Sequence, residues 1–378
     1  MRNKKIEFYR HNISSIDIKE CVEVLNSLFL TTGSIVKEFE EKLADYLDIR
    51  YAVGVTSCTD ALFLALKGLG VKEGDEVITT PLSFIATANV IEYCGAKPVF
   101  VDVESTTGNI DADKIEKAIT PKTKALVVVH LYGQMCDMQK IAAIAKKHSL
   151  KLIEDAAHCI EGVRDGIRPG QLSDAACFSF YATKNITSGE GGAVVTNNKD
   201  FYSWLLRARQ HGMSKSASER YTKKYEHYDM EFLGFKANMN NIQAALLLNQ
   251  LDRIEELLKK KEKIAKRYDK AFKKNPFISI PSVLPSTKHA RHIYTIWVDP
   301  KKRDNILRSL QERMIGVAVN FRPIHLMSYY KKKYGYKKGD FPIAEKIGAS
   351  TITIPLYPKL TSEEIDYIIN TINTITQK

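Results

Sequence analysis

The first two thirds of the chain alternate short apolar segments with longer segments whose apolar residues recur every three or four positions. The short segments are apolar throughout, which is typical of strands buried on both faces of a mainly parallel sheet. The longer ones have helical spacing, so helices are expected on both sides of that sheet. Strands are predicted at residues 51–55, 76–79, 98–102, 125–129, 151–155 and 176–180, and helices at 16–28, 35–47, 60–69, 85–93, 112–119 and 138–148.

The pattern changes after about residue 240. Residues 242–270 read as one long helix with an apolar stripe. Beyond it we predict strands at 293–298, 317–320 and 351–354 and helices at 305–314 and 363–375. The pattern therefore predicts a large α/β domain over residues 1–240, with an N-terminal helical segment. Residues 241–378 are predicted to form a linker helix and a smaller C-terminal α+β domain.

The composition is that of an ordinary globular protein, with 378 residues, 44% hydrophobic and 26% charged. No apolar run is long enough to span a membrane, and the N-terminus lacks the apolar core of a signal peptide. The six cysteines are isolated, and none stands with histidines at metal-ligand spacing. We therefore expect a cytoplasmic protein with reduced cysteines and without a metal site.

The net charge of +12 has two explanations, an anionic partner or a lysine-rich surface. Local excesses of lysine at residues 259–261 and 331–333 are read as solvated helix faces. Aromatic residues do not alternate with basic ones in the way that single-stranded nucleic-acid sites require. The expectation is a protein with no nucleic-acid partner and no membrane partner.

Lys184 is the most informative candidate for chemistry. It ends an aromatic, strand-like run, and a polar turn with glycines follows before a second apolar run at residues 193–196. A lysine held by backbone at the end of a strand suits covalent chemistry with carbonyls, as in Schiff bases with pyridoxal phosphate. The alternative is a solvated lysine, since the chain carries 56 lysines and arginines.

Other candidates also lie where strands end, which is where open parallel sheets bind ligands. Residues 57–60 could bind a phosphate at a helix start or could simply cap the helix. Asp155 could pair with a protonated pyridine nitrogen, cap a helix or pair with a structural lysine. His158 could contact the same ring or be structural, and Phe84 could stack on that ring or pack in the core.

In this order, these residues resemble the nucleotide-sugar aminotransferases of the DegT/StrS type, a branch of the fold-type I pyridoxal-phosphate enzymes. The similarity covers nearly the whole chain, and the segment around Lys184 is specific to that family. It implies a fold-type I α/β structure with a smaller C-terminal α+β domain. The matching segments are residues 31–33, 39–40, 57–62, 74–78, 154–158, 178–192, 211–213, 234–245, 323–325 and 329–330.

The resemblance also implies roles for individual residues. Lys184 would attach the cofactor, Asp155 would pair with its ring nitrogen, and Asn238 would reach the phosphate bound by a neighbouring subunit. The protein is thus expected to be a homodimer with shared active sites. The implied catalytic residues are Lys184, Asp155 and His158; the cofactor contacts add Phe84, Thr59, Asp60, Ser179 and Asn238; the substrate contact is His325.

Two positions depart from the family pattern. Cys58 stands where relatives usually have glycine or alanine, and Ala237 stands where they usually have an aromatic residue. A cysteine is small enough to fit, whereas Ala237 could alter the edge of the pocket.

The implied reaction is a ping-pong transamination. Glutamate would give its amino group to pyridoxal 5′-phosphate, and pyridoxamine 5′-phosphate would pass it to a keto group of a nucleotide-linked 4-keto-6-deoxy sugar, most often at C4. The product would be a 4-amino-4,6-dideoxy sugar for polysaccharide biosynthesis. The alternatives are a 3-keto sugar or keto-inositol acceptor and a non-catalytic regulatory protein that binds the cofactor. Related dehydratases carry histidine in place of the lysine, so Lys184 argues against dehydration.

Overall fold

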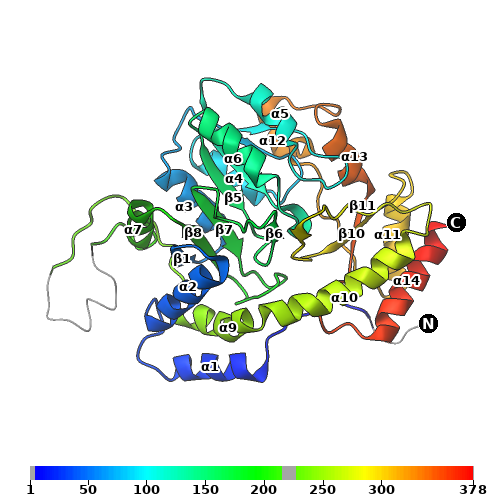
Figure 1. Ribbon diagram of the computed structural model, residues 1–378, viewed down its shortest axis with the longest axis horizontal. Helices are drawn as coiled ribbons and strands as arrows, with labels where there is room; N and C mark the ends of the chain where they lie inside the picture. The colour runs from blue at the N-terminus through cyan, green and yellow to red at the C-terminus, as the bar shows by residue number, and fades with distance from the viewer. Residues whose placement is uncertain (1–4, 215–226, 378) are drawn as a thin grey trace.

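The computed structural model describes residues 5–214 and 227–377. A sheet of seven strands forms its centre, and Figure 1 shows helices packed around this sheet. The strand order is β1-β8-β7-β5-β4-β2-β3. Pairing is antiparallel between β1 and β8 and between β8 and β7, and parallel from β7 to β3. The predicted α/β class is confirmed. The strands are β1 (Tyr51–Val55), β2 (Glu76–Thr79), β3 (Lys97–Phe100), β4 (Thr123–Val129), β5 (Lys151–Asp155), β7 (Ala175–Ser179) and β8 (Gly192–Thr196).

Helices cover both faces of this sheet because its central strands are apolar on both sides. Along β4, Ala125 and Val127 pack into one apolar cluster, whereas Leu126 and Val128 pack into the other. The first face is covered by α3 (Cys58–Gly68), α4 (Ala86–Tyr93) and α7 (Lys199–Ala208). The second is covered by α2 (Ser34–Leu47), α6 (Met138–Lys147) and α9 (Asn241–Asp252).

A second apolar core lies in the C-terminal part of the chain. There β10 pairs antiparallel with β11, and α10, α11 and α14 pack around the pair (Figure 1). Ile6 also lies in this core, where its N–H donates to the Met314 carbonyl at 2.8 Å. The elements are α10 (Ile254–Phe272), β10 (Tyr294–Trp297), α11 (Arg303–Glu312), β11 (Thr351–Ile354) and α14 (Ser362–Thr376).

The remaining elements are short or peripheral. Helix α1 packs on α9, several of whose buried residues belong to the apolar core of the large sheet. The domain boundary predicted at residue 240 stays a prediction. In the described ranges, no helix is both long and apolar enough to cross a membrane. These elements are α1 (Ser15–Leu25), α5 (Ala112–Ile115), β6 (Val163–Arg164), β9 (Thr287–Lys288), α12 (Ser328–Tyr334), α13 (Pro342–Ser350) and the 3₁₀ turns Glu116–Ala118, Leu131–Gly133 and Ile324–Leu326.

Three sequence predictions need correction. The long helix expected at 242–270 breaks at Arg253, whose guanidinium bonds Asp17 and the Asn12 carbonyl while the chain passes from one core to the other. The strand expected at 317–320 is a single bridge from Ala318 to Thr353, because only Ala318 exchanges backbone hydrogen bonds with Thr353, at 3.1 and 2.8 Å. The lysine cluster at 259–261 is not wholly solvated, since Lys261 is only 5% exposed.

Candidate active site

A cavity of about 510 Å³ opens at the carboxyl ends of the parallel strands. The C-terminal part of the chain and the N-terminal residues Phe8 and Tyr9 contribute to its wall. The predicted residues that line it are Lys184, Asp155, His158, Phe84, Thr59 and Ser179; those that do not are Asp60, Asn238 and His325.

The start of helix α3 forms one end of the cavity. Ser57 caps the helix, because its Oγ accepts the Asp60 N–H at 3.0 Å. The Asp60 carboxylate in turn accepts the hydroxyl protons of Ser57, at 2.7 Å, and Thr56, at 2.5 Å. The first N–H groups of a helix have no partner inside it, so those of Cys58 and Thr59 can bind an anion. Asp60 therefore contributes by ordering the hydroxyls behind this helix start.

Gly192 lets strand β8 approach that helix start closely. A Cβ at this position would lie 2.4 Å from the Ser57 carbonyl carbon and 2.6 Å from the Cys58 nitrogen. Any side chain at Gly192 would therefore displace the backbone that offers these N–H groups.

Asp155 ends β5 and lies 6% exposed at the cavity wall. Its Oδ2 accepts a proton from the Thr87 hydroxyl at 2.7 Å, and its Oδ1 accepts the Ala157 N–H at 3.2 Å. Burial raises the pKa of this carboxyl group. Because a buried carboxylate ionises readily only when a cation faces it, Asp155 is suited to a positively charged ligand atom.

Lys184 lines the same cavity on a turn held by the bond from its N–H to the Tyr181 carbonyl, 2.9 Å. Burial lowers the pKa of its amine to about 8, although the negative charge of Asp155 opposes that change. A large fraction of the amine is therefore neutral near pH 8, as nucleophilic attack on a carbonyl requires. Burial also raises the pKa of the Cys58 thiol, so this thiol stays neutral.

His158 lies in a group of stacked rings. Its ring is 4.3 Å from that of His292 and 5.8 Å from that of Phe321, centroid to centroid. Burial lowers the pKa of both histidines well below the usual value, so both are neutral. The Nδ1 atom of His158 has no hydrogen-bond partner among the described residues.

Sequence reasoning missed Thr87, His292 and Phe321. Thr87 lies in the first turn of α4, just after Phe84, and a hydroxyl residue at that helix start was a usable signal. His292 and Phe321 reach the cavity from the C-terminal part of the chain, and no local pattern marks them. Phe84 is 58% exposed, with its ring 6.3 Å from that of Phe321. Its stacking on a cofactor ring stays a prediction.

Two predicted residues lie away from the cavity. The Asn238 amide donates to the Thr32 hydroxyl at 2.6 Å and accepts from the Lys236 amine at 2.6 Å. Its contact with a neighbouring subunit stays a prediction. His325 is fully buried and pairs with Glu345 at 3.0 Å. The structure does not bring His325 to the cavity, so contact with a substrate there would require it to move.

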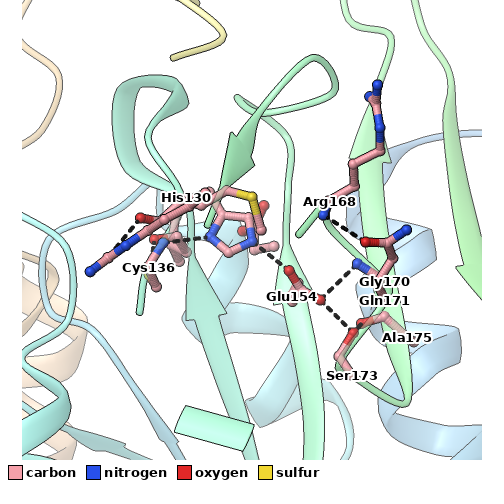
Figure 2. A network of polar contacts seen from close by, with 12 residues as sticks. His130, Cys136, Glu154, Arg168, Gly170, Gln171, Ser173 and Ala175 are labelled. Carbon is pink, nitrogen blue, oxygen red and sulfur yellow. Dashed lines mark hydrogen bonds and ion pairs between the residues drawn. The ribbon is translucent and has the colours of Figure 1, made fainter. Parts of the chain in front are cut away.

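On the other side of β5 lies a closed polar network (Figure 2). Glu154 Oε2 accepts from His130 Nε2 at 2.6 Å, and its Oε1 accepts from the Gly170 N–H at 2.8 Å and the Ser173 hydroxyl at 2.5 Å. The Cys136 N–H donates to His130 Nδ1 at 3.2 Å, which places the imidazole proton on Nε2. Every polar atom of this pair is thus satisfied.

The cavity residues fit pyridoxal 5′-phosphate. Lys184 offers an amine for the aldehyde, Asp155 a buried carboxylate for the ring nitrogen, and the α3 start free N–H groups for the phosphate. The close approach of Gly192 to the start of α3 supports the same fit and does not depend on the pKa values of Lys184 and Asp155.

Comparisons with known proteins agree with this chemistry. The model of the DegT/DnrJ/EryC1/StrS aminotransferase family matches residues 11–373. Spore coat polysaccharide biosynthesis protein SpsC of Bacillus subtilis (strain 168) is 42% identical over 382 residues, covering 100% of this chain and 98% of that protein. A UDP-4-amino-4,6-dideoxy-N-acetyl-beta-L-altrosamine transaminase of Campylobacter jejuni (strain 81-176) is 34% identical, covering 99% of this chain and 98% of that protein.

A solved structure extends the agreement to the whole fold. The putative sugar aminotransferase Spr1654 from Streptococcus pneumoniae, in its PMP form, superposes with a TM-score of 0.93 at 32% identity. The match covers 98% of this chain and 99% of that one, and the PLP form of the same protein gives a TM-score of 0.92.

Proposed function

This chain belongs to the DegT/DnrJ/EryC1/StrS aminotransferase family, and we propose that it moves the amino group of glutamate to C4 of a nucleotide-linked 4-keto-6-deoxy sugar. One observation carries the proposal, namely that Lys184, Asp155 and the start of α3 line one cavity. The names of the relatives support a sugar acceptor, and the transaminase name specifies a nucleotide and a 4-amino-4,6-dideoxy product. SpsC supports a place in polysaccharide biosynthesis.

The residues of this cavity would hold the cofactor as follows. Lys184 would attach it, Asp155 would accept a hydrogen bond from its protonated ring nitrogen, and Phe84 and His158 would flank the ring. Thr59 and Ser179 would bind the phosphate, and Asp60 would assist through the Ser57 hydroxyl that it orders. Bound pyridoxal 5′-phosphate supplies an electron sink for the charge that develops when a proton leaves the amino-bearing carbon.

Lys184 would also move that proton. Once its Nζ is free, a pKa near 8 lets the neutral amine accept a proton from the donor's α-carbon and release it at the adjacent position. Burial raises the pKa of Asp155, and a cation that faces it would favour its ionised form. The neutral His158–His292 stack adds no positive charge that would compete with the ring nitrogen.

We further propose a homodimer in which Asn238 reaches the partner's cofactor phosphate. Asn238 does not line the cavity of its own chain, which is consistent with such an exchange. Helix α1 also exposes an apolar face that pairing could cover: Ile16, Ile18, Val22 and Leu25, with Leu28 just beyond the helix.

The test is an acceptor panel with the purified, cofactor-loaded protein and glutamate. The panel contains 4-keto-6-deoxy sugars on GDP, UDP and dTDP, one 3-keto nucleotide sugar and one keto-inositol. We expect 2-oxoglutarate to form beyond one equivalent per cofactor, the amount that the donor half-reaction releases by itself, only with a 4-keto sugar. We expect NMR of the product to place nitrogen at C4. Turnover of only the 3-keto sugar or the inositol would replace the proposed acceptor. Absence of any absorbance change with amino donors would reject aminotransfer itself.

Two segments, residues 213–230 and 322–330, would shape the pocket for the acceptor sugar. Of these, residues 215–226 lie outside the described part of the chain.

A further inference from the structure

Asn185, the residue after Lys184, is the centre of a buried polar cluster that the proposed chemistry does not use. Its Nδ2 donates to both oxygens of Glu161, at 2.7 and 2.6 Å, and to the Ala290 carbonyl at 2.8 Å. Its Oδ1 accepts from Lys261 Nζ at 2.8 Å, and His292 Nδ1 lies 3.3 Å from the same oxygen. Both ends of the Asn185 amide are therefore fixed.

Lys261 is an unusual member of this Asn185 cluster. It lies on the apolar stripe of helix α10, between Leu258 and Ile264, which are both buried. A lysine in a core-facing position costs free energy unless its ammonium group is paired. Besides Asn185, Lys261 Nζ bonds the His292 carbonyl at 3.1 Å. An aliphatic residue would fill this position at lower cost, so a pure packing role does not explain the lysine.

Glu161 balances that charge from the other side of the amide. The carboxylate is 1% exposed, and its two oxygens meet Asn185 Nδ2. Burial raises the pKa of Glu161 and lowers that of Lys261, while each charge opposes the change in the other. The amide thus lies between two buried groups of opposite charge.

Three separate parts of the fold meet at this amide. Glu161 follows β5, Lys261 belongs to α10, and Ala290 and His292 precede β10. Figure 1 shows α10 running from α9 to the C-terminal core, so the cluster connects the Lys184 turn to the helix that joins the two cores. His292 continues the connection into the cavity, because its ring stacks on that of His158.

We propose that Asn185, Glu161 and Lys261 are positioning residues that fix the backbone of Lys184 so that its amine meets the cofactor aldehyde in one geometry. The inference rests on the proposed attachment role of Lys184. A lysine side chain has several rotatable bonds, so its amine can take many positions. A fixed backbone narrows the range of positions that the Lys184 amine can take. The cluster has no direct contact with a reactant in this role.

The test measures covalent capture instead of turnover. Cofactor-free protein is mixed with pyridoxal 5′-phosphate, quenched with borohydride at set times, and digested, and mass spectrometry follows label at Lys184. Visible circular dichroism of the loaded protein reports how the bound ring is oriented. The variants are Asn185→Ala, Lys261→Met and Glu161→Gln.

Two matched controls separate positioning from general loss of stability. Lys260→Met removes the neighbouring lysine of α10, which is exposed and pairs with Glu256. Asn275→Ala removes a buried amide that bonds Asn373 and Thr376 in the C-terminal core, outside the cavity lining.

Capture at Lys184 should slow by about tenfold in Asn185→Ala and Lys261→Met and about threefold in Glu161→Gln, since misplacement of a reacting group is costly. The visible dichroism should change in the same order, and both controls should stay within about twofold of the wild type. Capture at the wild-type rate in Lys261→Met, or equal slowing in Asn275→Ala, would overturn the inference. If Asn185→Ala does not fold, the rate of capture at Lys184 in Lys261→Met decides whether the inference holds. No capture at Lys184 in the wild type would instead reject the proposed function.

Discussion

The two sides of strand β5 carry adjacent carboxylates with opposite surroundings. Glu154 faces the network of Figure 2, where His130, Gly170 and Ser173 satisfy its oxygens. Asp155 faces the cavity with only two hydrogen-bond donors among the described residues, the Thr87 hydroxyl and the Ala157 N–H, and burial raises its pKa. A saturated carboxylate stabilises the fold, whereas an under-satisfied one is available to a ligand.

The largest expected effect comes from removing the amine on the cavity side. Lys184→Ala should lower the rate of amino transfer by more than about 10⁴-fold, because both the attachment point and the proton carrier are lost. Steady-state assays with glutamate and the accepted sugar measure it. Lys199→Ala, an exposed lysine at the start of α7, is the control and should be fully active. Full activity of Lys184→Ala would remove this residue from the mechanism.

Asp155→Asn should lower kcat by about 10²- to 10³-fold, since the ring nitrogen loses its charged partner. Steady-state assays with glutamate and the accepted sugar measure this loss.

The same carboxyl group should also make the stability of the cofactor-free protein depend on pH. The folded-state pKa of Asp155 is raised, so this group costs stability increasingly as pH rises above its unfolded-state pKa. Without cofactor, Asp155→Asn should therefore have a higher free energy of unfolding than the wild type near pH 8. Urea denaturation at several pH values measures this difference, which should vanish in acid. A variant less stable than the wild type near pH 8 would contradict this assignment.

Asn238→Ala tests whether the cavity is completed by a second subunit. We expect about a tenfold weaker retention of the cofactor, measured by dialysis and absorbance, for loss of one hydrogen bond to a charged phosphate. Under dialysis conditions at which Asn238→Ala has lost its cofactor, mixing it with Lys184→Ala and re-pairing the subunits should give about a quarter of wild-type activity. Half of the re-paired dimers are hybrids, and each hybrid contains one intact site. If no activity returns although mixed dimers form, sites are not shared.

The smallest effect on amino transfer is expected on the saturated side of β5. Glu154→Gln should change kcat by less than about threefold but lower the free energy of unfolding by about 2 kcal/mol, because a charged acceptor of buried bonds is lost. Urea denaturation and rate assays on the same preparation measure both. Glu41→Gln, on the exposed face of α2, should leave both unchanged. A large loss of kcat without a loss of stability in Glu154→Gln would erase the distinction between the two sides.

Much of the fold could be predicted because its strands are uniformly apolar and its turns are well marked. Strands β1, β2, β5 and β11 have the predicted bounds. The break at Arg253 could not be seen, because the partners of its side chain, Asp17 and the Asn12 carbonyl, are distant in sequence. The sheet gathers the predicted residues of its strand ends, whereas His292 and Phe321 enter through tertiary packing alone.

The sequence contains a signal for the burial of Lys261 that the charge of its neighbours obscures. Its neighbours Lys259 and Lys260 are exposed, and the three together look like a solvated face. The periodicity of α10, with buried residues at 254, 257, 258, 264, 265 and 268, places 261 on the core side. A lysine on the buried face of a helix indicates a buried polar partner. The helical periodicity therefore predicts the burial of Lys261, although the three consecutive lysines suggest a solvated surface.

The position of Ile6 has a consequence for synthesis of the chain. Its backbone pairs with Met314 and Gly316, and the Phe8 and Tyr9 that follow line the cavity. A ribosome makes these two pairing regions about 300 residues apart, which at about 5–20 residues per second is a delay of roughly 15–60 s. Over that interval the segment around Ile6 lacks the backbone partners with which it pairs in the folded protein. The wall of the cavity that it forms therefore closes only after Gly316 has been made, by which time the strands of the central sheet have been synthesised.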